Sequence, residues 1–198
     1  MSGPKSLGTV VFNEQNKQEA EINNRIEKYN GNLSALYPLL KDRNIPVKVK
    51  LIIFNTILKP ILTYAAETWS LTTKTSSQIQ AAEMKTLRLI LGVTRRDRIR
   101  NTVIRERLGV EPVLDTVEKS RLRWFGHVQR MPADEYPKHY LNWTPQGRRP
   151  VGRPRMRWMQ GVERALESRG LSLEQVNHHN EHREVWRRII VRLPTDTI

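Results

Sequence analysis

The chain of 198 residues contains no cysteine. This excludes disulfides, zinc sites built on thiolates, zinc knuckles and cysteine nucleophiles. Apolar residues are also scarce, at 38% against 27% charged residues, which is typical of a surface-rich helical protein rather than a large compact enzyme. Residues 1–10 lack the apolar core of a secretion signal. We therefore expect a nuclear or cytoplasmic protein that is not secreted.

Acidic residues are in short supply as well. Only 20 Asp and Glu stand against 34 Lys and Arg, which gives a formal net charge of +14. Such an excess repels itself in a compact fold, and it is favoured when a polyanion neutralises it and releases counterions. We therefore expect RNA or DNA as the partner. We expect no membrane contact, because the longest apolar stretch, 47–66, is broken by lysines, Asn55 and Pro60.

What the sequence does contain is helical periodicity, which predicts a mainly α protein. A compact helical bundle is expected at 16–92, after an extended lead-in at 1–15. Pro38 together with Asp42 and Asn44 is expected to close the first helix, and Pro60 to kink or break the second. The rest divides by composition into a basic helical segment, a basic Pro/Gly-rich loop and a C-terminal helical segment, at 93–131, 132–153 and 154–198.

Short motifs follow one another in a fixed order along the chain. They are Leu7-Gly8 and the runs PILTYAAETW at 60–69, MKTLRLILG at 84–92, RRDR at 95–98, RLRWFGHVQRM at 121–131 and GRPRMRW at 152–158. In this order and spacing they resemble the C-terminal part of the reverse transcriptases of non-LTR, LINE-type retrotransposons. The resemblance covers about 5–191, which is nearly the whole chain.

The resemblance implies a division of labour. In such enzymes the catalytic carboxylates lie in the palm, before the Leu-Gly element, so they would precede residue 1 here. The chain would then comprise a primer-grip-like remnant at 1–15, a thumb-like bundle at 16–92 that holds the template–primer duplex, and a basic region that grips RNA or target DNA. Ser6 departs from the family, because an aromatic residue commonly precedes Leu-Gly, and the terminal Cys/His knuckle of some members is absent.

Catalysis is not expected from the isolated chain. Two-metal phosphoryl transfer needs closely placed carboxylates, and the nearest acidic pair, Asp134-Glu135, is flanked by prolines and is better interpreted as a solvated turn. The histidines His178, His179 and His182 lack a strong further ligand. We therefore expect no metal and no other cofactor.

The basic half carries the strongest functional signal. Between Thr94 and Trp158, 16 Lys and Arg face only 7 Asp and Glu, and arginine suits phosphate because its planar fork donates two parallel hydrogen bonds. Trp124 is expected either to stack on a base or to be buried in the core. The candidate nucleic-acid-binding residues are Arg95, Arg96, Arg98, Arg121, Arg123, Trp124, Arg148, Arg149, Arg153, Arg155 and Arg157.

The run GRRPVGRPR at 147–155 is similar to an AT-hook core, but Val151 replaces the first arginine. We expect it to grip backbone phosphates, with a plain linker as the alternative. Two other functions remain open for the whole chain. It could be an accessory subunit that complements a separate reverse transcriptase palm, or a protein-interaction module built on the apolar helix at 47–62.

Overall fold

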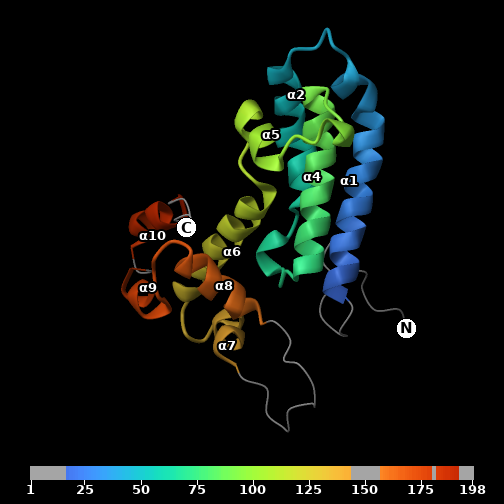
Figure 1. The fold of residues 1–198 in the computed structure, drawn as a ribbon. Coiled ribbons are helices and arrows are strands. Elements are labelled where there is room, and N and C mark those ends of the chain that lie inside the picture. The colour runs from blue at the N-terminus through green and yellow to red at the C-terminus, as the bar shows by residue number, and fades with distance from the viewer. Residues whose placement is uncertain (1–16, 144–156, 180–181, 192–198) are drawn as a thin grey trace, which may run out of the picture. The chain divides into compact units, whose positions relative to one another are not determined.

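The computed structural model describes residues 17–143, 157–179 and 182–191. Every regular element in these ranges is a helix, which confirms the mainly α prediction (Figure 1). No described helix has the length and apolar character needed to cross a membrane. The described chain divides into two compact units. The first contains the residues up to Ala65 together with Leu71–Thr116, and the second contains Ala66–Ser70 and the residues from Val117 onward.

Helices that cross the first unit side by side form its bundle. The longest, α1 and α4, pack along each other, while α3 packs on α1 and α5 packs on α4. These elements are α1 (Lys17–Lys41), α2 (Val47–Ile53), η1 (Phe54–Leu58), α3 (Lys59–Leu62), α4 (Thr73–Leu91) and α5 (Asn101–Leu108).

The core of the first unit follows the helical period. In α1 the buried residues Ile22, Tyr29, Leu33 and Leu40 recur every four or seven positions, so they form one face toward α4. The Tyr29 hydroxyl lies 2.5 Å from the Thr86 Oγ1 of α4, which satisfies both buried groups. Burial raises the pKa of Tyr29, so this hydroxyl stays protonated.

A buried ion pair connects α4 to α5. Glu83 is fully buried, and one of its carboxylate oxygens accepts from Arg105 at 2.5 Å. The other accepts from the main-chain N–H of Val113 at 2.8 Å. Burial raises the pKa of Glu83, and the hydrogen bond from Arg105 opposes that rise. The carboxylate therefore has the partners that a buried charge requires.

The ends of α4 follow local sequence signals. Thr72 caps its N-terminus, because its side chain accepts from the Thr75 N–H and the Thr75 hydroxyl accepts from the Thr72 N–H. At the other end Gly92 takes φ 74°, a left-handed conformation that glycine adopts without strain. Thr72 and Gly92 therefore set the two ends of α4.

Two prolines behave differently from each other. The first helix ends where Pro38, Asp42 and Asn44 predicted, since α1 stops at Lys41, but Pro38 itself lies inside the helix. The carbonyl of Ser34 that loses its partner there belongs to an exposed residue, so water can satisfy it. The predicted disruption at Pro60 takes the form of a π turn, η1, directly before α3. A wider turn of this kind accommodates a proline that an α-helix would reject.

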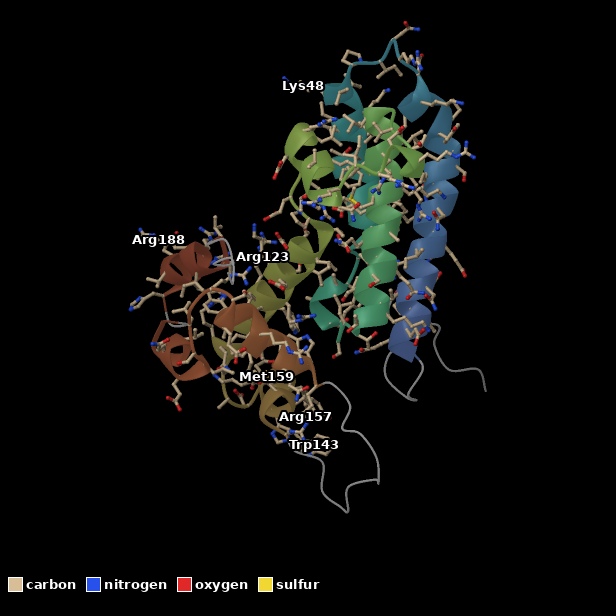
Figure 2. All side chains as sticks on the ribbon, viewed as in Figure 1. Lys48, Arg123, Trp143, Arg157, Met159 and Arg188 are labelled. Carbon is tan, nitrogen blue, oxygen red and sulfur yellow. The ribbon has the colours of Figure 1, made fainter. Side chains whose placement is uncertain are left out.

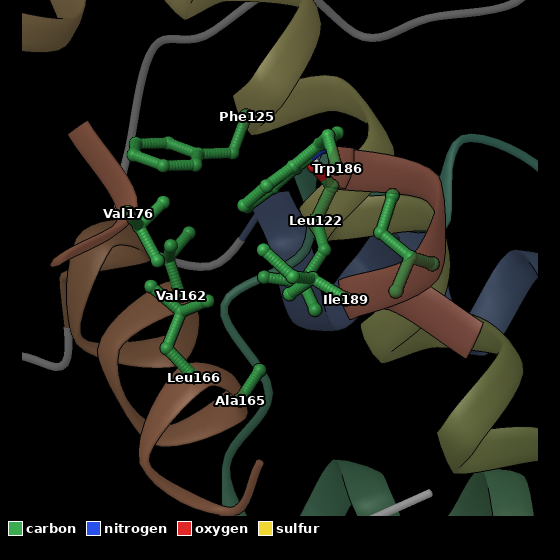
Figure 3. Packing of buried hydrophobic residues seen from close by; sticks show 9 residues of the cluster. Leu122, Phe125, Val162, Ala165, Leu166, Val176, Trp186 and Ile189 are labelled. Atoms are coloured by element: carbon green, nitrogen blue, oxygen red, sulfur yellow. Dashed lines mark hydrogen bonds between the residues drawn. The ribbon is translucent and has the colours of Figure 1, made fainter. Parts of the chain in front are cut away.

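The second unit is built on a core from four helices (Figure 3). Leu122 and Phe125 come from α6 (Val113–Gln129), Val162 and Leu166 from α8 (Trp158–Glu167), Val176 from α9 (Leu173–His179), and Trp186 and Ile189 from α10 (Arg183–Val191). The Trp186 indole N–H donates to the Leu122 carbonyl at 3.0 Å. Gly126 allows this approach, since a Cβ there would lie 2.0 Å from the indole nitrogen.

One further helix occupies a segment that was predicted as loop. α7 (Tyr136–Asn142) lies within 132–153, so the prediction of a continuous loop there is wrong. Pro137 near the start of α7 tolerates its missing N–H, because the first turn of a helix leaves that group without an intrahelical acceptor. The remainder of that loop from 144 onward, and the lead-in at 1–15, lie outside the described residues.

Candidate nucleic-acid interface

A hollow of about 1270 Å³ opens between α1 and α4 of the first unit. Polar side chains such as Asn23, Asn30 and Gln78 line it among apolar ones, and the turn η3 (Arg95–Asp97) contributes Arg95 to the lining. Among the described residues that line it there is no Asp or Glu, whereas four are basic. These four are Lys85, Arg88, Arg95 and Arg98.

α4 places two of these cations on the hollow. Lys85 and Arg88 are three residues apart, so they lie on one face of the helix. The Lys85 ammonium is exposed and donates to Asn30 Oδ1 of α1 at 3.3 Å. Arg88 donates to Asn101 Oδ1 at 2.7 Å and is half-buried. Lys85 is therefore open to an anion, while Arg88 mainly fixes the chain that follows α4.

The turn η3 presents the other cations. Asp97 accepts from the Thr94 N–H at 2.6 Å and from its hydroxyl at 2.9 Å, and these bonds lower the pKa of Asp97. The carboxylate is thus directed to Thr94. Arg98 follows with φ 51°, a left-handed conformation that turns the chain sharply. The arginines of this turn are all exposed, and Arg95 and Arg98 line the hollow whereas Arg96 does not.

Arg121 occupies a different position from the one expected of a phosphate-binding residue. It is only 5% exposed, and its guanidinium donates from Nη2 to the Trp69 carbonyl at 2.8 Å and from Nη1 to the Gly161 carbonyl at 3.3 Å. Burial lowers the pKa of Arg121, and Glu118 opposes that change. The structure therefore makes Arg121 an internal connector of the second unit, which corrects its place among the candidates.

Arg123 and Trp124 are exposed on α6. Trp124 is 37% exposed, so the alternative of core burial is wrong, and its ring lies 5.5 Å from that of His127, centroid to centroid. Arg157 is exposed directly before α8. Figure 2 shows Arg123 and Arg157 on different helices of the second unit. The remaining candidates, Arg148, Arg149, Arg153 and Arg155, lie outside the described residues.

Sequence reasoning missed Lys85 and Arg88. The charge count began at Thr94, after α4, and so passed over both. The signal that could have found them is a polar stripe within an otherwise apolar helix, since Gln78, Lys85 and Arg88 share one face of α4. It also missed the exposed cations of α10, where Arg183 lies near enough to Arg130 to lower the pKa of Arg130, after the larger effect of burial.

Comparison with known proteins gives one informative similarity. A protein of Caenorhabditis elegans described as an uncharacterized transposon-derived protein is 27% identical over 158 residues. The aligned part is 76% of this chain and 57% of that protein, so the chain spans little more than half of its relative. No protein-family model and no solved structure matches the chain. The similarity agrees with a transposon-related origin.

Proposed function

We propose that the chain is the thumb and following basic region of a retrotransposon reverse transcriptase, and that it binds nucleic acid through the hollow between α1 and α4. The observation that carries this proposal is the lining of that hollow, in which polar side chains and four basic ones stand among apolar ones and no carboxylate is found among the described residues. The order of the sequence motifs and the transposon-derived relative support the assignment.

The chemistry of the lining suits a sugar–phosphate backbone. Lys85, Arg95 and Arg98 supply charge, while amide and hydroxyl groups of α1 and α4 supply the neutral hydrogen bonds that position phosphates and sugars. Such contacts carry no base information, so binding should be nearly independent of sequence. A duplex, either DNA or an RNA–DNA hybrid, is the ligand that the proposed thumb would hold.

In this proposal catalysis belongs to a palm, either in further residues of the same polypeptide or in a separate chain. Metal ions held there by carboxylates would stabilise the attacking and leaving oxygens. The described residues do not fit that role, since no three His, Asp or Glu side chains among them gather closely enough to hold a metal ion. In this proposal the role of the chain is to hold the duplex.

The test is a binding titration across a salt series with a labelled 20-base-pair duplex. The variant Lys85→Gln/Arg95→Gln/Arg98→Gln removes three exposed cations from the hollow. The control Lys28→Gln/Lys48→Gln/Arg107→Gln removes three exposed cations of the same unit that do not line it. We expect only the first variant to lower the slope of log affinity against log salt by about 2 to 3, because each phosphate contact contributes about 0.9. Equal losses in both variants would show that the hollow is not the interface.

A second function, docking to a protein, is favoured by one surface of the first unit. The apolar side chains Val47, Val49, Ile52 and Ile57 are exposed on α2 and η1. A separate palm is the partner that this surface would serve in an accessory subunit. Co-elution of the chain with a purified non-LTR palm, abolished by Ile52→Glu, would support it, and independent elution would contradict it.

A further inference from the structure

Helix α7 presents its aromatic side chains to solvent. Tyr136 is 77% exposed, Tyr140 66% and Trp143 54%. Large rings usually lie on the buried face of a short helix, since each removes a large apolar area from water when it is packed. Three exposed rings at positions i, i+4 and i+7 therefore form one aromatic face, and an exposed patch of this kind marks a binding surface.

Contacts on the opposite side hold the helix in this orientation. The Lys138 ammonium donates to the carbonyls of Gln129 at 2.7 Å and Met131 at 2.9 Å, where α6 ends. Leu141 packs against the core of the second unit, together with Trp158. A rotation of α7 that buried the rings would break these contacts and expose Leu141, so the aromatic face is a stable feature of the fold.

The spacing of the rings follows the helix. The His139 ring meets that of Tyr140 edge to face, with centroids 5.9 Å apart and planes at 75°. Tyr136 and Tyr140 are four residues apart, which separates them by about 6 Å along the helix axis. Trp143 follows at the end of the helix. Successive rings therefore follow one direction, as in proteins that stack the bases of a single strand.

The charge of the sequence that contains this face defines the ligand further. From 136 to 162 the sequence has six Lys and Arg and no Asp or Glu, while Asp134 and Glu135 stand just before α7. Arg157 is exposed directly before α8 in the same unit. A ligand with both negative charge and flat apolar surfaces is complementary to this surface. Unpaired nucleic acid has both, whereas a duplex hides the faces of its bases.

We propose that the aromatic face of α7, formed by Tyr136, Tyr140 and Trp143, is a stacking platform for unpaired bases of single-stranded nucleic acid. This site lies in the second unit and is independent of the duplex-binding hollow of the first. It takes its specificity for unpaired strands from ring stacking. An apolar protein partner is the competing occupant.

The experiment compares two probes of equal charge on the whole chain. One is a fluorescent oligonucleotide of fifteen thymidines, and the other has the same phosphates but abasic sugars. We expect the wild type to bind the thymidine probe at least about tenfold more tightly, because stacking contributes about 1–3 kcal/mol per base. The variant Tyr136→Ser/Tyr140→Ser/Trp143→Ser should bind both probes alike, with the abasic affinity unchanged. The single variant Trp143→Ser should lose part of the preference for the thymidine probe. It replaces the triple variant in this test if the triple variant is unfolded at the assay temperature.

Controls separate this site from the proposed hollow. Lys85→Gln/Arg95→Gln/Arg98→Gln should weaken duplex binding while leaving the preference for thymidine over abasic probe intact. Equal affinity of the wild type for the two probes would overturn the proposal, as would a preference that survives the triple variant. A triple variant that instead loses only self-association or binding to a protein would assign the face to a protein partner.

Discussion

The guanidinium of Arg121 donates to the main-chain carbonyl of Trp69, a residue 52 positions earlier in the chain. Through this bond and its bond to Gly161, one side chain joins the segment Ala66–Ser70, α6 and α8 within the second unit. Arginine suits this task because its fork reaches two carbonyls in different directions while it keeps its charge.

Arg121→Ala should destabilise the second unit without changing nucleic-acid binding. The substitution leaves the Trp69 carbonyl without its donor and opens a cavity, and we expect a loss of about 2–4 kcal/mol in the free energy of unfolding. Urea denaturation measures this loss, and Arg123→Ala on the exposed face of the same helix is the control, with a change within about 0.5 kcal/mol. If Arg121→Ala folds stably but lowers the slope of log affinity against log salt, Arg121 is a nucleic-acid-binding residue.

Two glycines in helices should respond to alanine in opposite ways. At Gly126 the new Cβ would collide with the Trp186 ring, so Gly126→Ala should cost about 3 kcal/mol or more. At Gly31 nothing lies within 4 Å, and Gly31→Ala should stabilise α1 by about 0.5–1 kcal/mol. The melting temperatures of both variants measure these changes in stability. Similar melting temperatures for the two would mean that α10 does not pack on α6 as described.

Glu83 and Arg105 should be strongly coupled. Glu83→Leu leaves the guanidinium of Arg105 buried without its carboxylate, and Arg105→Met leaves the carboxylate without its cation, so each should cost about 3–5 kcal/mol. The double variant should cost less than the sum by about 1–3 kcal/mol, because neither charge is then left alone. A double-mutant cycle in urea tests this coupling, and strict additivity would show that the pair is not formed in solution.

Trp124→Ala should weaken binding without lowering stability, since the ring is exposed. If a base stacks on it, the affinity for a single-stranded or hybrid probe should fall by about 1–3 kcal/mol. The control is Trp158→Phe, which removes the indole donor to the Glu67 carbonyl at 2.7 Å and should lower the melting temperature while sparing affinity. Unchanged affinity in Trp124→Ala would remove this residue from the interface.

Features of the fold that depend only on neighbouring residues can be predicted from the sequence. The stop of α4 at Gly92 and that of α5 at Gly109 follow from local backbone preference, because both glycines take positive φ. The burial of Arg121 could not be predicted in this way. Its acceptors, the carbonyls of Trp69 and Gly161, are far from it in the sequence, and no local pattern indicates them. α7 was missed because prolines and polar residues suggested a loop, while the contacts of Lys138 that hold it arise only in the folded unit.

The segment Ala66–Ser70 belongs to the second unit although the first unit continues on both sides of it. The ribosome therefore delivers Trp69 long before α6 and α8 exist to cover it. The first unit can be completed once Thr116 has emerged, but the residues that cover Trp69 in the second unit are then still to be made. Cotranslational folding of this protein should then proceed in two stages, and an arrested chain that ends near 116 should carry an exposed tryptophan whose emission shifts to the blue only after the C-terminal helices are made.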